Sequence, residues 1–363
     1  MRLVVLSAGI LSCVCLMIGS ARGEYILNPN HPLKIGVGGY ARVYTGKLES
    51  YQYNNVLKAQ PALTAHYDVS DTLTLRGKLA YRIVRDDRFA SKKVSRFYDV
   101  FGTIDSKSYG KIDVGKLLNV AYLLHQGSVD VSCMDVDDSD ISYFYQKPKG
   151  FFAPTLTYLN TDSRDPKISY TTPDLNGFKA GMTLVESEDD DPDSIAPQNV
   201  KIDHGKGMIG AMQYKHYWNN ETWVGISGGI AFYKDNRFFV GHKNIDSNHR
   251  EYSLGSKAGW QGWTVGISYR RMLFSDKIAL KDSSAVSMGI AHQFKKYAVS
   301  LTWLHSQAKF VEKDKYNHIM LSNRYTFNSY LEGYLSGGKI DFISNINGEK
   351  ESVFGIMGIQ LKI

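Results

Sequence analysis

The sequence predicts an all-β protein, a transmembrane antiparallel β-barrel of sixteen strands. Three observations lead to this fold class. Apolar and polar residues alternate with a period of two along most of the chain. No stretch has the spacing of a convincing amphipathic helix. Tight turns and long polar connections follow one another in alternation, which is typical of an up-and-down barrel that spans a membrane.

The first 23 residues are predicted to be a secretory signal peptide. Met1 and Arg2 precede the apolar run LVVLSAGILSCVCLMIGS, and the small-residue site Ala21-Arg22-Gly23 follows it. The run is short and ends in a small-x-small site, which disfavours the alternative of an N-terminal anchor helix. We therefore expect cleavage after about Gly23, so that residues 24–363 form the barrel. Of the three cysteines only Cys133 then remains, and it can form no internal disulfide.

Two early segments show which face of the predicted wall is apolar. In KIGVGGYARVY, residues 34–44, the Ile and Val side chains share one face and Arg42 lies on the other. In TLTLRGKLAYRIV, residues 72–84, the leucines oppose three basic residues. A Lys or Arg that faces lipid at the bilayer midplane costs roughly 2–4 kcal/mol, so the basic face must point inward. The predicted pore-lining basic residues are Arg42, Arg76, Lys78, Arg82 and Lys111.

Sixteen candidate strands account for the chain after the signal peptide. They begin near Lys34, Leu57, Thr72, Arg96, Lys111, Pro166, Phe178, Gly207, Thr222, Tyr252, Thr264, Ala285, Tyr297, Asn317, Tyr330 and Ser352. Every second connection is tight, as in VSD, PDLNG and WNNE, whereas ESEDDDPDSIAPQNVKIDHGK and DNRFFVGHKNIDSNHR are long and polar. A soluble β-sandwich also alternates, but it would mix loop lengths at both ends. The even strand number brings both chain ends to the rim of short turns.

Three segments in the order of the strands resemble a known family. They are SYGKIDVGKLLNVAYLL, TYLNTDSRDPKISYTTPDLNGFKAGMTL and HIMLSNRYTFNSYLEGY. The second contains a Y-x-S/T-P-x-x-x-G-F core at Tyr170, Thr172, Pro173, Gly177 and Phe178. Together they resemble the Gram-negative general diffusion porins, the trimeric sixteen-stranded family, from about Leu33 to the end. One departure is the last residue, Ile363, where the family usually ends in Phe or another aromatic.

The resemblance implies that the third loop, residues 119–165, folds into the lumen and narrows the channel. This connection is by far the longest, and it contains the acidic stretch MDVDDSD. The acidic residues carried over to the constriction are Asp130, Asp135, Asp137, Asp138 and Asp140. They would face the inward basic residues across a water-filled gap, and opposed charges of this kind set ion preference.

Two other interpretations of the acidic stretch stay open. It can be a solvated loop that never enters the lumen. It also partly matches a calcium-binding loop, but Asp140 stands where such a loop needs glycine and Gln146 stands in place of its final glutamate. We expect no metal site, no cofactor and no nucleic-acid partner. A second acidic run, residues 188–193, is expected to lie on the outer surface and to bridge to lipopolysaccharide through divalent cations.

The functional hypothesis is an outer-membrane channel for passive diffusion of ions and small hydrophilic solutes, assembled as a homotrimer in contact with membrane lipid. The alternative is a structural or adhesive surface barrel with a closed lumen. No local Ser/His/Asp arrangement points to an enzyme, so we expect no catalytic residues. Without the signal peptide the chain has 41 basic and 36 acidic residues, since Arg2 and Arg22 leave the 43 basic residues of the full chain. We expect weak ion selectivity, with a slight preference for cations set by the acidic loop.

Overall fold

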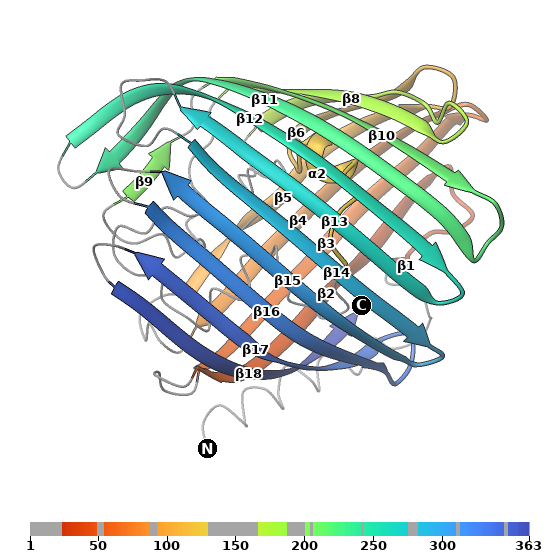
Figure 1. Cartoon of the computed structure of the whole chain (residues 1–363). Coiled ribbons are helices and arrows are strands. Elements are labelled where there is room, and N and C mark those ends of the chain that lie inside the picture. Colours follow the sequence, from red (N-terminus) through yellow and green to blue (C-terminus); the bar gives the residue numbers. More distant parts are fainter. Residues whose placement is uncertain are drawn as a thin grey trace.

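Sixteen antiparallel strands close into one barrel in the computed structural model (Figure 1). The structure describes residues 24–48, 54–86, 93–129, 166–186, 200–203, 206–240, 243–274, 282–309, 313–344 and 348–362. Eighteen strands form a single sheet, and two of them are short extensions, β1 (Glu24–Ile26) and β9 (Val200–Asp203). The remaining sixteen make the wall, so the predicted fold class and strand number are confirmed.

The wall strands run in chain order, each paired with the next. They are β2 (Leu33–Leu48), β3 (Asn54–Ser70), β4 (Leu73–Asp86), β5 (Lys93–Ser106), β6 (Gly110–Lys116), β7 (Pro166–Thr171), β8 (Phe178–Val185), β10 (Gly207–Tyr217), β11 (Thr222–Val240), β12 (Lys243–Trp260), β13 (Trp263–Phe274), β14 (Asp282–Phe294), β15 (Tyr297–Lys309), β16 (Lys313–Thr326), β17 (Leu331–Ser344) and β18 (Gly348–Lys362). Closure leaves no free edge, so the backbone groups of each wall strand pair with neighbours on both sides.

The last wall strand closes the barrel against the first. In β18, Phe354 pairs with Leu48 and Lys362 pairs with Tyr40 of β2. Strand β1 then continues along the same edge of β2, where Glu24 pairs with Gly38. The start of the described chain and its end therefore lie in one line beside β2, at the rim of short turns.

The two faces of the wall differ in polarity. Large apolar side chains on the outer face are about half exposed, among them Leu79, Ile104, Ile267 and Leu301. The alternate positions, which face inward, carry many of the buried polar and charged side chains. This is the inverse of a soluble barrel and matches a wall that meets lipid outside. The described residues contain no helix of the length and apolarity needed to cross a bilayer.

Aromatic side chains are concentrated on one side of the outer face near the rim of short turns. Exposed aromatics there include Phe178, Tyr214, Trp218, Trp260, Trp263, Phe294 and Tyr297. Three exposed tryptophans, Trp218, Trp260 and Trp263, lie here on or beside β10, β12 and β13. Trp and Tyr favour the interface between lipid and water, so β10–β15 form the part of the wall best suited to face the membrane.

Several of the strands that begin at the long-loop rim start earlier than the sequence predicts, whereas β7 and β10 begin at Pro166 and Gly207 as predicted. β3, β5, β12 and β16 begin at Asn54, Lys93, Lys243 and Lys313, against predicted starts near Leu57, Arg96, Tyr252 and Asn317. The predicted loop DNRFFVGHKNIDSNHR is instead a hairpin in which Val240 pairs with Lys243. Alternation of apolar and polar side chains is required only where a strand crosses the bilayer. Backbone hydrogen bonding between strands does not need this alternation, so the strands continue past the alternating segments.

Candidate functional site

The third connection enters the barrel directly after β6. Asn119 is buried, and its side chain accepts a hydrogen bond of 2.9 Å from the backbone N–H of Tyr122, which caps the short helix α2 (Val120–Leu123). The N–H of Val120 donates to the Thr183 hydroxyl on the inner face of β8 at 3.0 Å. Figure 1 shows α2 inside the wall. The connection therefore begins against the inner surface of the barrel.

The next residues cross the inner face strand by strand. The N–H of Gln126 donates to the Ser227 hydroxyl of β11 at 2.7 Å, and that hydroxyl donates back to the Gln126 carbonyl at 3.2 Å. Ser128 N–H donates to the Ser268 hydroxyl of β13 at 3.4 Å. Val129 packs on Ala291 and Ala298, so the described part of the connection ends at β14 and β15.

Inward-facing glycines make room for this backbone. A Cβ on Gly255 would overlap the carbonyl oxygen of Gln126, and one on Gly266 would overlap the carbonyl of Gly127. The residues from 126 to 129 thus lie in direct backbone contact with β12 and β13, which only a residue without a side chain allows. The five predicted constriction acids, Asp130, Asp135, Asp137, Asp138 and Asp140, lie outside the described residues. Their place at a constriction stays a prediction.

Three of the five predicted basic residues form ion pairs with carboxylates on the same wall. Arg76 Nη2 lies 3.1 Å from Asp105 Oδ2, Lys78 Nζ lies 2.9 Å from Asp99 Oδ2, and Lys111 Nζ lies 2.8 Å from Asp113 Oδ2. Arg76 and Lys78 of β4 contact carboxylates of the neighbouring strand β5, whereas Lys111 and Asp113 both belong to β6, and Asp105 of β5 lies opposite Lys111. The basic and acidic side chains thus alternate across the inner face of β4, β5 and β6.

These carboxylates were absent from the sequence prediction. The signal was available, because in GKIDVGK Lys111 and Asp113 fall on one face and Ile112 and Val114 on the other. The sequence prediction placed the acidic side chains of the pore only in the third connection. The inner face of β4–β6 therefore carries acidic and basic side chains in ion pairs and is not uniformly basic.

Arg42 and Arg82 contact amide and aromatic side chains of the wall. Arg42 Nε donates to Gln360 Oε1 at 2.7 Å, and its guanidinium lies 4.4 Å from the centre of the Tyr40 ring. Arg82 is buried, donates to Gln60 Oε1 at 3.4 Å and lies 3.0 Å from the centre of the Tyr98 ring. Hydrogen bonds and aromatic faces fix both guanidinium groups against the wall. The role of all five basic residues in lining the pore remains a prediction.

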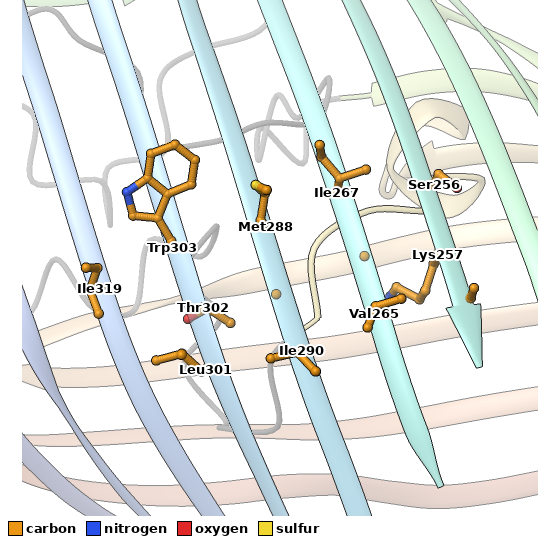
Figure 2. A pocket seen from close by; sticks show the side chains of 13 residues that line it. Ser256, Lys257, Val265, Ile267, Met288, Ile290, Leu301, Thr302, Trp303 and Ile319 are labelled. Carbon is orange, nitrogen blue, oxygen red and sulfur yellow. The ribbon is translucent and has the colours of Figure 1, made fainter. Parts of the chain in front are cut away.

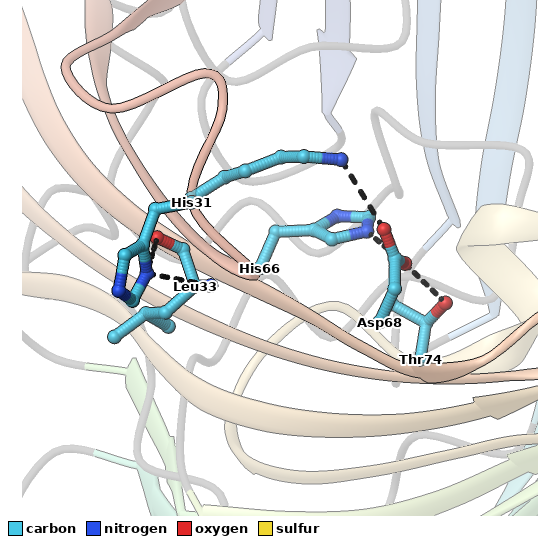
Figure 3. A network of polar contacts seen from close by, with 6 residues as sticks. His31, Leu33, His66, Asp68 and Thr74 are labelled. Atoms are coloured by element: carbon cyan, nitrogen blue, oxygen red, sulfur yellow. Dashed lines mark hydrogen bonds and ion pairs between the residues drawn. The ribbon is translucent and has the colours of Figure 1, made fainter.

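A further polar network lies at the mouth formed by the short turns (Figure 3). The carboxylate of Asp68 contacts Lys34 Nζ at 3.2 Å, His66 Nε2 at 2.7 Å and the Thr74 hydroxyl at 3.0 Å. The three partners come from β2, β3 and β4, so this network ties the first wall strands together at the rim. It leaves a partly exposed charged surface at the entrance.

The described part of the opposite wall contains a buried polar triad. Glu251 of β12 accepts two hydrogen bonds from Arg270 of β13, at 3.1 Å and 2.7 Å, and its other oxygen lies 2.9 Å from His249 Nε2. All three side chains are buried. Elsewhere on β11–β15 the inward positions carry mostly Gly, Ala, Ser and Thr, so charge is concentrated on β2–β6 and the connection lies against the weakly charged side.

The environment of His125 holds its ring uncharged. Burial, reinforced by the positive charge of Lys257, lowers the pKa of His125 from 6.5 to about 4. The ring lies beside Gly127 and Gly255, at the point where the connection meets β12. Within the described part of the chain no three His, Cys, Asp or Glu side chains are placed to hold a metal ion.

Comparison with known proteins agrees with this geometry. Residues 98–342 match the family model described as Gram-negative porin. No curated protein sequence matches the chain. Solved structures with the same fold include an anion-selective porin from Comamonas acidovorans, at 14% identity and a TM-score of 0.65 over 91% of this chain and all of that one.

Two other solved structures extend the likeness. OmpF of Salmonella typhi, solved with daunomycin, has 14% identity and a TM-score of 0.64 over 94% of this chain and 100% of that one. The outer-membrane channel DcaP of Acinetobacter baumannii has 8% identity and a TM-score of 0.64 over 91% and 97%. Identities this low establish the fold, and the family match covers the greater part of the chain; the chain belongs to the Gram-negative porin family.

Proposed function

We propose that the barrel is an outer-membrane channel through which ions and small hydrophilic solutes diffuse passively. The observation that carries the proposal is the contrast between the two faces of one closed wall. The outer face presents large apolar side chains, and the inner face presents paired charges and hydroxyls. Such an interior stays hydrated, and a hydrated interior passes polar solutes while it disfavours apolar ones.

The proposal is tested by conductance. The purified protein in a planar bilayer should give stepwise currents, and folded, inserted protein without any current would contradict it. A deletion within residues 127–143 separates the channel from the alternative of an adhesive barrel with a closed lumen. A channel should widen or change its selectivity, whereas a closed barrel should show no conductance in either form.

The ion pairs on the inner face of β4–β6 bear on the ion selectivity of the channel. Because Asp105, Asp99 and Asp113 compensate Arg76, Lys78 and Lys111, the wall near β4–β6 contributes little net charge. Distant surface charges are screened over about 8 Å at physiological salt. The acidic residues between 130 and 140 then decide the sign, and we expect weak selectivity with a slight preference for cations. Replacing these five aspartates with asparagine should shift the reversal potential under a salt gradient towards anion preference. An unchanged reversal potential would show that the five aspartates do not line the constriction.

The proposed assembly is a trimer in which copies associate through the outer face of β18 and β2–β5. The solved OmpT of Vibrio cholerae is described as a trimer. In this chain the outer face opposite the tryptophan-rich side carries small residues, and a Cβ on Gly77 or Gly355 would meet nothing within 4 Å. Such a flat apolar surface allows close approach of a second copy.

A matched pair of variants tests this surface. Gly77→Trp should dissociate the trimer on a mild-detergent gel, because the large ring would separate the subunits. Gly210→Trp, on the outer face of β10, should leave the trimer intact, because that side faces lipid and tolerates an interfacial aromatic. If both variants dissociated, or both stayed trimeric, the contact between subunits would not lie on the outer face of β18 and β2–β5. The proposal also includes export by a cleaved signal peptide and contact with lipopolysaccharide in the outer leaflet.

A further inference from the structure

The outer face of β12–β16 contains a hollow of about 620 Å³ (Figure 2). Its walls are apolar side chains from four neighbouring strands: Ile267, Met288, Ile290, Leu301, Trp303 and Ile319. The volume lies within the range of about 300–1,000 Å³ that is usual for small-molecule sites. Because the lining is almost entirely hydrocarbon, it offers a polar solute few hydrogen bonds, whereas an acyl chain can make apolar contacts along it.

Cross-strand register explains why the hollow forms. Ile267, Met288 and Trp303 stand opposite one another in one row, and Val265, Ile290 and Leu301 form the next. On β12 the same two rows continue as Ser256 and Ala258. These small side chains fill less of the hollow than the large side chains of the neighbouring strands do, so the hollow is open on the β12 side. The hollow is thus a short groove between two rows of large side chains.

Polar and charged side chains lie on the same strands, towards the long-loop rim. Arg271 is four residues beyond Ile267 on β13, and Lys315 is four residues before Ile319 on β16. At about 3.4 Å per residue this places them roughly 14 Å along the strand from the groove. For strands tilted by about 45° this is about 10 Å along the membrane normal, and the long Arg and Lys side chains extend from there towards the head groups of the outer leaflet.

The net charge of this cluster is positive. Asp282 compensates Arg271 through two contacts, at 3.2 Å and 2.8 Å. Lys309 and Lys315 also belong to the cluster, and among the described residues neither forms an ion pair. Gln307 pairs with Lys315 across the strands and hydrogen-bonds Ser284 at 3.4 Å, which adds an amide at the same level. The two lysines therefore offer charge to an anionic head group.

We propose that this face binds one anionic lipid of the outer leaflet, with an acyl chain in the groove and the negatively charged head group beside Lys309 and Lys315. The inference rests on the proposed membrane location of the barrel. Both parts of the ligand are needed: the groove supplies apolar contact, and the lysines select the anionic head group. The exposed Trp260 and Trp263 on β12 and β13 favour contact of this face with lipid, on the side of the barrel away from the proposed subunit contact.

Native mass spectrometry of the full-length protein in mild detergent tests the site. With phosphatidylglycerol and phosphatidylcholine of identical chains in equal amounts, the wild type should retain phosphatidylglycerol several-fold more. Lys309→Gln with Lys315→Gln should bring the two lipids to parity. Ser256→Leu with Ala258→Leu should reduce retention of both lipids, since the added side chains occupy the groove. Lys234→Gln, an exposed lysine on β11 outside the cluster, is the matched control and should behave as the wild type.

Several results would overturn the site. They are equal retention of both lipids by the wild type, an unchanged preference in the double lysine variant, and displacement of the lipid by soluble glycerol phosphate. Heat-modifiable migration on gels shows that each variant is folded. Conductance should not change in any of these variants, because the substitutions lie outside the lumen. Failure of the wild type to conduct would therefore count against the channel and not against the lipid site.

Discussion

Gly255 of β12 lies so close to Gln126 that a Cβ on the glycine would overlap the Gln126 carbonyl oxygen. The contact joins the wall to the connection that follows β6, more than a hundred residues earlier in the chain. Hydrogen bonds from Gln126 to Ser227 and from Ser128 to Ser268 fix the same segment on neighbouring strands. The described start of the third connection is therefore part of the inner wall.

Gly255→Ala should loosen this contact. Overpacking of a tight site costs about 1–3 kcal/mol, so the segment around Gln126 should detach in part and the current through the channel should become noisier. Single-channel recording measures this directly. Gly228→Ala is the control, because that glycine lies on the outer face of β11 and its nearest neighbour is 3.5 Å from an added Cβ. Quiet, unchanged currents in Gly255→Ala would show that the contact is dispensable.

Asp99→Asn should shift ion preference towards anions. The substitution leaves Lys78, at present 2.9 Å from Asp99, without its compensating charge on the inner wall. The reversal potential under a salt gradient reports the change. Asp174→Asn, which breaks the longer and more exposed contact with Lys179 at the rim of short turns, should have little effect. If both variants shifted the reversal potential equally, ion preference would not depend on whether the charge lies inside the lumen or at the rim.

Acidification should release the start of the third connection. The pKa of His125 is about 4 when the segment is docked and about 6.5 when it is free. The free form binds more protons, so docking loses stability as pH falls from about 6.5 towards 4 and regains it on return to neutral pH. The protonated ring would also face the positive charge of Lys257.

Current fluctuations recorded between about pH 7 and pH 4 measure this release. His125→Gln cannot take up the proton and should remove the part of the pH dependence that lies in that window. A variant that fluctuates with pH like the wild type would place the sensor on another group.

The mature chain should begin at or next to Glu24. Along β2, Lys362 pairs with Tyr40 and Glu24 pairs with Gly38, so only the position opposite Gly39 separates β18 from β1. Intact mass of protein from the outer membrane should therefore correspond to cleavage near Gly23. A full-length mass in assembled protein would exclude the cleavage.

The sequence alone determined the sixteen-strand barrel, its apolar exterior and the strand starts at the rim of short turns, such as Thr222 and Tyr297. These follow from local rules, because alternation and turn residues act over a few neighbours. Tertiary structure alone decided which charges meet. The pairing of Lys78 with Asp99, the approach of Gln126 to Gly255 and the groove bounded by Met288 and Trp303 all depend on register between strands. Register is set by closure of the whole ring, and no local segment carries that information.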